Sequence, residues 1–327
     1  MGVRWDDESI AKEALKQFPV QGERLVYLGK SDNVTFQVKT KQESLNYLMK
    51  LHYATKGSHS KKAVESELLW LEALAADTTL TVPSPVRTRD NGLTTEVDVN
   101  TSGERVVVTL HQWVNGELLD REPTPGETRS LAQLMAALHR HAMEWNAPAG
   151  FTRPVYDTDN VLSLPCPLKR LPEMNVISGE AYACLERTAH KIAAGLQLQT
   201  VAKPTWGLIH SDLHESNYVF DQGSPRPIDF SACGYGFYLF DVAETLLHLS
   251  LENRREFLSA YREERQLREI DAKSLDLFFV WAILRNFAFL ANNPAEHASL
   301  SELIPRVAKS YFEYYLKDEP VLGIGDS

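Results

Sequence analysis

The sequence predicts an α+β fold in two lobes, a small N-terminal lobe built on an antiparallel sheet with one internal helix and a larger, mainly helical C-terminal lobe. Two observations predict it. Residues 24–113 contain strand-like segments rich in β-branched and aromatic residues, separated by polar turns. From Pro125 onward, apolar residues recur mainly at helical spacing. Strands and helices that are segregated along the chain are typical of α+β architecture.

The N-terminal elements are predicted from periodicity and from breaks in it. Between Glu8 and Phe18 the apolar residues fall on one helical face, and Pro19 ends the run. In order, the expected elements are a helix at 8–18, strands at 24–28, 34–40 and 45–52, a loop at 53–62, a helix at 63–76 and, after the Val82-Pro83-Ser84-Pro85 break, two or three strands ending in 104–113.

The C-terminal part is predicted to be mainly helical, with helices at 130–144, 180–198, 241–251, 253–266 and 274–290. One interruption, 206–230, has two short apolar runs around a polar motif and is expected to form a small β region. The segment Gly150–Pro172 is rich in loop residues. We place the boundary between the lobes after residue 114, so that 1–114 and 115–327 are the two lobes and His111–Gly116 is the hinge.

The bulk properties of the chain narrow its class. Its 327 residues, 43% of them hydrophobic, are enough for a large core and roughly two packed units. No stretch approaches the ~20 apolar residues of a membrane-spanning helix, and Met1–Glu8 lacks the layout of a secretory signal. The three cysteines, Cys166, Cys184 and Cys233, form no CxxC pair. We therefore expect a reduced, cytoplasmic protein without a membrane partner.

The charge balance bears on possible partners. The chain has 34 Lys and Arg residues against 44 Asp and Glu residues, a formal charge of −10. A nucleic-acid binder would need a basic face, so no nucleic-acid partner is expected. An acidic surface is compatible with a cationic substrate, and solubility alone explains it equally well.

The polar motif in the short β region has the spacing of a phosphoryl-transfer site. Asn217 lies five residues after Asp212, and Asp229 lies 17 residues after Asp212. Phosphoryl transfer needs a carboxylate that positions the attacking hydroxyl and oxygen ligands that hold magnesium. The protein-kinase loop HRDxxxxN has an Asp and an Asn at this spacing, and a later DFG supplies the metal-binding Asp. Here Asp229-Phe230-Ser231 has Ser in place of Gly.

In these motifs the sequence resembles the aminoglycoside phosphotransferase/choline kinase family, a branch of the protein-kinase-like fold. Its pattern is H-G-D-x-x-x-x-N, then I-D-F/W, then aromatic-D-aliphatic-A. The chain has, in that order, His210-Ser211-Asp212, Asn217, Ile228-Asp229-Phe230 and Phe240-Asp241-Val242-Ala243. Ser211 replaces the usual Gly. The resemblance implies an ATP- and Mg²⁺-dependent kinase that phosphorylates a hydroxyl of a small molecule, such as an aminoglycoside, homoserine, or a choline-like or sugar-like acceptor.

The resemblance also implies a role for each motif residue. Asp212 would orient or deprotonate the substrate hydroxyl, and Asn217 and Asp229 would bind magnesium. Asp241, with His210, would brace the catalytic loop. From the residues alone, Asp241 and Glu244 could equally form a capping box at a helix start. Lobe 1–114 would bind the nucleotide, and lobe 115–327 would carry the catalytic and substrate-binding residues.

In the N-terminal lobe, Lys50 is a charged residue inside an apolar strand, and a Lys buried without a partner is costly. Kinase-like lobes use such a Lys on the nucleotide phosphates and pair it with a helix Glu. The next helix offers Glu65 and Glu67, and the resemblance favours Glu67 because it stands one turn before Leu71. The alternative is a Lys50 that snorkels from an edge strand.

Two further segments would complete the nucleotide site. The loop Gly29-Lys30-Ser31-Asp32-Asn33 could cover the phosphates, with Asn33 as the contact, although without GxGxxG it could also be an ordinary hairpin turn. Trp113-Val114-Asn115-Gly116 would bind adenine through backbone groups, while Trp113 could equally be a core residue. His139, in the helical segment Leu134–His139, is expected to be structural.

The acceptor is not specified by the motifs. Tyr235, Tyr238, Trp281 and Arg285 are candidates for the pocket, which the C-terminal helices and the segment after Asp229 would line. Arg285, if it faces a cleft, would favour an acceptor with a carboxylate or phosphate over a polycation.

Three other functions compete with this interpretation. A metallohydrolase could use His210, Asp212 and His214, which point the same way in an extended segment, but it leaves the remaining motif residues unexplained. A catalytically inactive nucleotide binder is disfavoured because no motif residue is missing. A bacterial protein Ser/Thr kinase of the same fold is disfavoured because the dozen residues between Asp229 and Asp241 are too few for a peptide-docking segment.

Overall fold

A computed structural model of the chain describes residues 6–30, 33–42, 45–53, 60–99, 104–267 and 271–323. The chain divides into two compact units. The first, which we call the sheet unit, contains the chain up to Leu118, Trp145–Pro154 and Ser216–Ala232. The second, the helical unit, contains the remaining segments. A lobe boundary at residues 114 and 115 stays a prediction, and the two later segments of the sheet unit show that one cut in the sequence does not separate the units.

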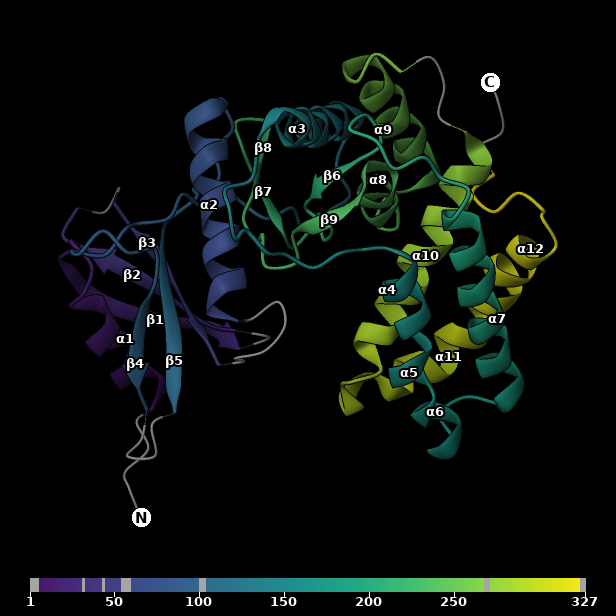
Figure 1. Cartoon of the computed structure of the whole chain (residues 1–327), viewed down its shortest axis with the longest axis horizontal. Coiled ribbons are helices and arrows are strands. Elements are labelled where there is room, and N and C mark those ends of the chain that lie inside the picture. Colours follow the sequence, from purple (N-terminus) through teal and green to yellow (C-terminus); the bar gives the residue numbers. More distant parts are fainter. Residues whose placement is uncertain are drawn as a thin grey trace. The chain divides into compact units, whose positions relative to one another are not determined.

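The sheet unit is built on a five-stranded antiparallel sheet with the order β1-β2-β3-β5-β4 (Figure 1). The strands are β1 (Gly22–Lys30), β2 (Val34–Thr40), β3 (Tyr47–His52), β4 (Thr95–Asp98) and β5 (Arg105–Gln112), and the helices are α1 (Asp7–Leu15) and α2 (Lys61–Asp77). The four strands predicted with bounds and the helix at 63–76 are confirmed to within two residues at each end.

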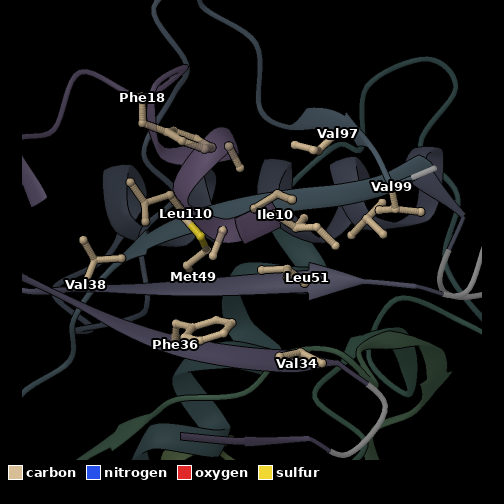
Figure 2. Packing of buried hydrophobic residues seen from close by; sticks show 14 residues of the cluster. Ile10, Phe18, Val34, Phe36, Val38, Met49, Leu51, Val97, Val99 and Leu110 are labelled. Atoms are coloured by element: carbon tan, nitrogen blue, oxygen red, sulfur yellow. The ribbon is translucent and has the colours of Figure 1, made fainter. Parts of the chain in front are cut away.

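The core of the sheet unit lies between α1 and one face of the sheet. Alternation along β2 places Val34, Phe36 and Val38 on the buried face. Figure 2 shows these side chains with Ile10 of α1 and Phe18, which follows the helix. Each such buried aliphatic or aromatic side chain contributes roughly 1.5–3 kcal/mol.

Helix α1 is shorter than the sequence predicts. It ends at Leu15 instead of Phe18, because the N–H groups of Gln17 and Phe18 bond to carbonyls only three residues back, at 3.0 and 3.1 Å. These tighter turns still bring the Phe18 ring into the core, with 0% exposure. The apolar periodicity therefore located the buried residues correctly but placed the helix end too late.

The helical unit contains the long helices and a two-stranded sheet, β6 (Trp206–Ile209) with β9 (Gly234–Phe237) (Figure 1). Its helices are α3 (Pro125–Glu144), α4 (Thr158–Ser163), α5 (Pro165–Leu168), α6 (Arg170–Glu173), α7 (Gly179–Leu196), α8 (Tyr238–Leu246), α9 (Leu251–Glu264), α10 (Ala272–Leu290), α11 (His297–Val307) and α12 (Glu313–Leu316), with a 3₁₀ turn at Pro294–Glu296 and a π-helical turn at Ala308–Phe312. The predicted α+β class is confirmed.

Several helices differ from the sequence-based expectation. Helix α3 begins at Pro125, five residues early, because Thr124 and Glu127 form a capping box. The segment expected to be loop-rich contains α4, α5 and α6, and the helices after Leu290 were not predicted. Asp157 caps α4, and Pro165 begins α5, so local capping chemistry outweighs the weak periodicity of these short segments.

Within the described part of the chain, no one helix has both the length and the apolar composition needed to cross a membrane. In the same part of the chain, α10 and residues 294–316 together are long and apolar enough, but the two are bent by 117° relative to each other.

Candidate active site

A tight hairpin in the sheet unit carries two of the predicted metal ligands. Strand β7 (Tyr218–Asp221) pairs with β8 (Ser224–Pro227), and the turn residues Gln222 and Gly223 both have positive φ, as a two-residue hairpin requires. The N–H of Ile228 donates to the carbonyl of Asn217 at 3.0 Å, so the pairing extends to the open end of the hairpin. Asn217 and Asp229 thus leave adjacent strands at the same end.

Lys50 of β3 lies against Asp229. Its Nζ is 2.9 Å from Asp229 Oδ1 and also donates to Ser231 Oγ at 3.2 Å. The Ser231 N–H and hydroxyl donate to the same Asp229 oxygen at 3.0 and 2.7 Å. The Lys50 side chain is 6% exposed, whereas that of Asp229 is 42% exposed. The buried Lys therefore has a carboxylate partner that is itself open to ligands.

The groups around Asp229 keep its carboxyl group ionised. Burial acts to raise its pKa, but the Lys50 ammonium and the hydrogen bonds from Lys50 and Ser231 outweigh burial, so the pKa of Asp229 lies well below its usual range. A carboxylate and the amide of an Asn that leaves the same end of the hairpin supply hard oxygen donors of the kind Mg²⁺ prefers, and Mg²⁺ commonly adds phosphates and water to such ligands. The donor chemistry at the hairpin end fits a magnesium ion.

Glu67 of α2 is buried, with its carboxylate oxygen 3.6 Å from the guanidinium of Arg153. The predicted Lys50–Glu67 pair stays a prediction. The neighbouring Glu65 accepts a hydrogen bond from Thr94 at 3.0 Å instead. The sequence did not single out Arg153, because an Arg in a loop-rich segment with no motif around it carries no recognisable signal.

The other two predicted nucleotide contacts adjoin strands of the sheet unit, Asn33 before β2 and Trp113 after β5. Asn33 is buried just before β2, and its Oδ1 accepts no hydrogen bond from the described residues. Ser31 and Asp32 of the predicted phosphate loop lie outside the described residues. Trp113 is half-buried and donates its backbone N–H to the carbonyl of Asn46 at 3.0 Å.

The predicted hinge is held against the hairpin. Glu117 and Phe220 exchange two backbone hydrogen bonds of 2.9 Å. Gly116 has a φ of +147°, and a Cβ there would lie 2.6 Å from Val219. Only glycine fits both this backbone conformation and this close approach.

In the helical unit, Asp241 holds the loop that begins at His210. Its carboxylate is buried and accepts the backbone N–H of His210 at 2.9 Å and that of Ser211 at 2.6 Å. His139 Nε2 lies 2.9 Å from the same carboxylate, and His139 Nδ1 lies 2.7 Å from the hydroxyl of Tyr261. Asp241 stands inside α8, so it does not form the capping box considered above.

Arg285 supports the same loop from the other side. Its guanidinium donates to the carbonyl of Ser211 at 2.9 Å and to Glu244 at 2.8 Å. It also lies over the Tyr156 ring, 5.2 Å from the centroid. Arg285 was expected to meet an anionic acceptor; both of these hydrogen bonds use its Nη1, and a contact with the acceptor stays a prediction.

The aromatic candidates for the substrate pocket are mostly core residues. Trp281 is fully buried and stacks on Phe240 at 4.1 Å, and Tyr238 is buried against His139 at 4.4 Å. Aromatic residues at helical spacing fill the core of the unit, which explains their position. Tyr235 is half-buried in β9, where its carbonyl accepts the N–H of Tyr156 at 2.7 Å.

Asp212 lies in a row of titratable groups. His214 Nε2 is 3.6 Å from its carboxylate, and the His214 ring stacks on that of His248 at 5.2 Å. His248 in turn lies 3.0 Å from Glu215. Burial acts to lower the pKa of His214, but the hydrogen bond and charge of Asp212 raise it overall. Among the residues that the structure describes, no group of three or more His, Cys, Asp or Glu side chains could hold a metal ion.

His248 also borders a pocket of about 500 Å³ in the helical unit. The pocket has an apolar wall from α10 and α11, and its polar lining includes Arg254, Arg306, Ser310 and Tyr311. Ser310 and Tyr311 belong to the π-helical turn, a form often found at functional sites. In the part of the chain that the structure describes, no Asp or Glu lines it, and none of the four predicted substrate residues does.

The sequence is similar to those of phosphotransferases. A sequence model of the "Phosphotransferase enzyme family" matches residues 25–278. The chain is 27% identical to an uncharacterized protein of Deinococcus radiodurans over 265 residues, which are 76% of this chain and 71% of that protein. It is 20% identical to the amicoumacin kinase of Bacillus subtilis over 278 residues, 80% of this chain and 78% of that protein.

Solved structures share the fold. A microcompartment-associated aminopropanol kinase has a TM-score of 0.80 and 26% identity, covering 96% of this chain and 99% of that one. An amicoumacin kinase in complex with AMP-PNP, Ca²⁺ and Ami has a TM-score of 0.78 and 17% identity, covering 97% and 95%. A choline kinase from Cryptosporidium parvum has a TM-score of 0.63 and 15% identity, covering 95% of each chain. These likenesses confirm the predicted kinase-like fold.

Proposed function

This chain belongs to the phosphotransferase enzyme family, and we propose that it transfers the γ-phosphate of ATP to a hydroxyl group of a small molecule. The observation that carries the proposal is the cluster of Lys50, Asp229 and Ser231 at the end of the hairpin that also bears Asn217. A lysine that is buried beside a solvent-open carboxylate suits a site where a metal ion and phosphates meet.

The residues of the sheet unit would hold the nucleotide. Asn217 and Asp229 would bind Mg²⁺, which when bound neutralises charge on the phosphates. Lys50 would contact the phosphates, with Glu67 nearby on α2. Asn33 and the backbone around Trp113 would contact the phosphates and the adenine, respectively. An arrangement of this kind works by positioning and charge neutralisation, because the transition state of phosphoryl transfer is loose.

Asp212 of the helical unit would orient the acceptor hydroxyl and take its proton. The loop that carries Asp212 is held by Asp241 through the N–H groups of His210 and Ser211, and by Arg285 through the Ser211 carbonyl. Because these hydrogen bonds hold the two residues that precede Asp212, and those to Asp241 are buried, the loop is preorganised and the carboxylate needs little rearrangement.

For the acceptor, we propose the pocket beside His248. The stacked rings of His214 and His248 connect this pocket with Asp212. Among the described residues, its lining includes Arg254 and Arg306 but no carboxylate, which favours an acceptor with neutral or anionic groups over a polycation. A screen of ADP release tests the function. It should include aminoglycosides, homoserine, choline, sugars and the amino alcohols that resemble the aminopropanol kinase substrate, with Asp212→Asn as the blank.

The outcome decides between acceptor classes. Turnover of one small molecule that requires Mg²⁺ and stops in EDTA supports the proposal. Labelling of a protein without turnover of any small acceptor would instead favour the protein-kinase alternative, and no Mg²⁺-dependent ATP binding at all would refute both.

A further inference from the structure

We propose that Arg153 is a positioning residue that joins helix α2 to the loop after Asp229 and thereby sets the direction of the Asp229 carboxylate. The inference rests on the proposed function, since it takes Asp229 as a metal ligand. Arg153 lies outside every motif of the sequence and comes from a segment of the sheet unit, Trp145–Pro154, that is distant in sequence from both of the elements that it contacts.

The guanidinium of Arg153 reaches two elements at once. Nη1 donates to the carbonyl of Ala63 in α2 at 2.9 Å, and the carboxylate of Glu67 lies 3.6 Å away. Nη2 donates to the carbonyl of Ser231 at 2.6 Å and lies 3.5 Å from that of Phe230. The side chain has no exposed surface. A buried guanidinium is tolerated only where its charge and donors are matched in this way.

The backbone around Arg153 is itself fixed to α2. The N–H of Thr152 donates to the hydroxyl of Ser66 at 2.9 Å. The Phe151 ring packs edge-on against Trp145, with centroids 5.3 Å apart. The neighbouring backbone and the bond to Ala63 therefore leave the guanidinium little freedom to move away from the helix.

Ser231 connects Arg153 with Asp229 through hydrogen bonds. Arg153 binds the Ser231 carbonyl, while the N–H and hydroxyl of Ser231 both donate to Asp229 Oδ1. Lys50 donates to the same oxygen. With Oδ1 held by three donors, the carboxylate can turn only by breaking them, so Oδ2 keeps one direction. Among the described residues, no donor bonds to Oδ2.

Apolar packing alone would not give this direction. Trp70 of α2 meets Phe230 edge-on, with centroids 5.6 Å apart, and this contact also joins the helix to the loop. Such contacts are not directional, whereas a planar guanidinium with donors on two edges defines an orientation. A Lys at position 153 keeps the charge but lacks the second edge, so Arg153→Lys separates orientation from charge.

The test uses Mg²⁺-dependent nucleotide binding, which does not need the acceptor. Binding of a non-hydrolysable ATP analogue would be titrated at a series of Mg²⁺ concentrations and again in EDTA. We expect Arg153→Lys to weaken the apparent Mg²⁺ affinity about 10- to 100-fold, as loss of a ligand-orienting partner does, with binding in EDTA unchanged. Arg105→Gln is the control. Arg105 is an exposed residue of β5 in the same unit, so this variant should behave as wild type.

Two further measurements keep the result decisive. Thermal unfolding without nucleotide shows whether Arg153→Lys is folded. Ser231→Ala tests the route, because it removes the hydroxyl that bonds to Asp229, so its effect on Mg²⁺ binding and that of Arg153→Lys should be less than additive. Folded variants with wild-type Mg²⁺ dependence, or two substitutions whose effects simply add, would overturn the positioning role alone. A wild-type protein that binds no Mg·ATP would overturn the proposed function together with it.

Discussion

The carboxylate of Asp241 accepts the backbone N–H of Ser211 at 2.6 Å, and Ser211 has a φ of +67°. This left-handed conformation costs a non-glycine residue about 1–2 kcal/mol. The buried hydrogen bond that the Ser211 N–H donates to the charged Asp241 carboxylate, together with the bond from Arg285 to the Ser211 carbonyl, offsets that cost. It also explains why glycine is the usual residue in the corresponding motif: glycine adopts this φ without strain.

Position 211 should therefore tolerate glycine but not a β-branched residue. We expect Ser211→Gly to change the free energy of unfolding by less than about 1 kcal/mol, since relief of strain is countered by greater chain entropy in the unfolded state. Ser211→Val should cost at least about 2 kcal/mol. Urea denaturation of the two variants measures the difference, and equal stabilities would contradict the assigned conformation.

Asp212→Asn should lower kcat by about 10²–10⁴-fold, equivalent to roughly 3–5 kcal/mol, because the hydroxyl loses its proton acceptor. Binding of Mg·ATP should persist, since the proposed nucleotide ligands are other residues. Steady-state kinetics together with nucleotide titration check both parts. Full phosphotransfer by Asp212→Asn would remove Asp212 from its assigned role.

Gly116→Ala should destabilise the protein by about 2 kcal/mol or more, because the new Cβ would lie 2.6 Å from Val219 in a backbone conformation that L-residues rarely adopt. Gly126→Ala is the matched control. Gly126 lies in the first turn of α3, where a Cβ would meet nothing within 4 Å, so alanine there should be neutral or stabilising. Similar unfolding curves for both variants would show that the close approach is absent in solution.

Stability should depend on pH through Glu244. Burial raises its pKa to about 7, although the charge of Arg285 acts to lower it. Between the ordinary value of 4.5 and about 7, the folded protein holds a proton that the unfolded chain has lost, so stability falls as pH rises. Wild type should accordingly lose stability relative to Glu244→Gln across this window in chemical denaturation. Parallel pH profiles would mean that Glu244 is ionised in the folded state.

Arg306→Gln should raise the KM for the acceptor by about tenfold while leaving the KM for ATP unchanged, since one hydrogen bond to a charged group contributes roughly 1.5–3 kcal/mol. Arg255→Gln is the control, because Arg255 is an exposed residue of α9 that does not line the pocket. An effect of equal size at both positions would place the acceptor elsewhere.

Much of the fold follows from local patterns. The period of two in β2 and the helical spacing in α2 predict those elements because each buries one face, and burial is what the spacing of apolar residues records. The short helices between Thr158 and Glu173 escape this reasoning. They depend on caps and prolines more than on an apolar face, so their signal is spread over single residues.

The site divides in a similar way. Lys50, Asn217 and Asp229 could be named as candidates because phosphoryl-transfer chemistry calls for these residue types and, for Asn217 and Asp229, for their spacing from Asp212. The supporting contacts of Arg153 and Arg285 could not be predicted, since an arginine that bonds to backbone carbonyls leaves no pattern around itself. Trp281, a candidate for the pocket, is fully buried against Phe240, and the sequence could not predict this because an aromatic residue in a helix looks the same whether it faces a ligand or the core.

The sheet unit is assembled from three separate segments of the chain, and the last of them ends only at Ala232. This arrangement affects both biosynthesis and engineering. A ribosome that has released the five strands has not yet delivered Arg153 or the β7–β8 hairpin, so the unit cannot be completed before about two thirds of the chain has emerged. The same threading means that residues 1–114 are not an exchangeable module. A chimaera that swaps only this block with a relative would combine Lys50 of one protein with the loop of the other that carries Asp229. Crossovers should succeed best where all three segments come from one parent.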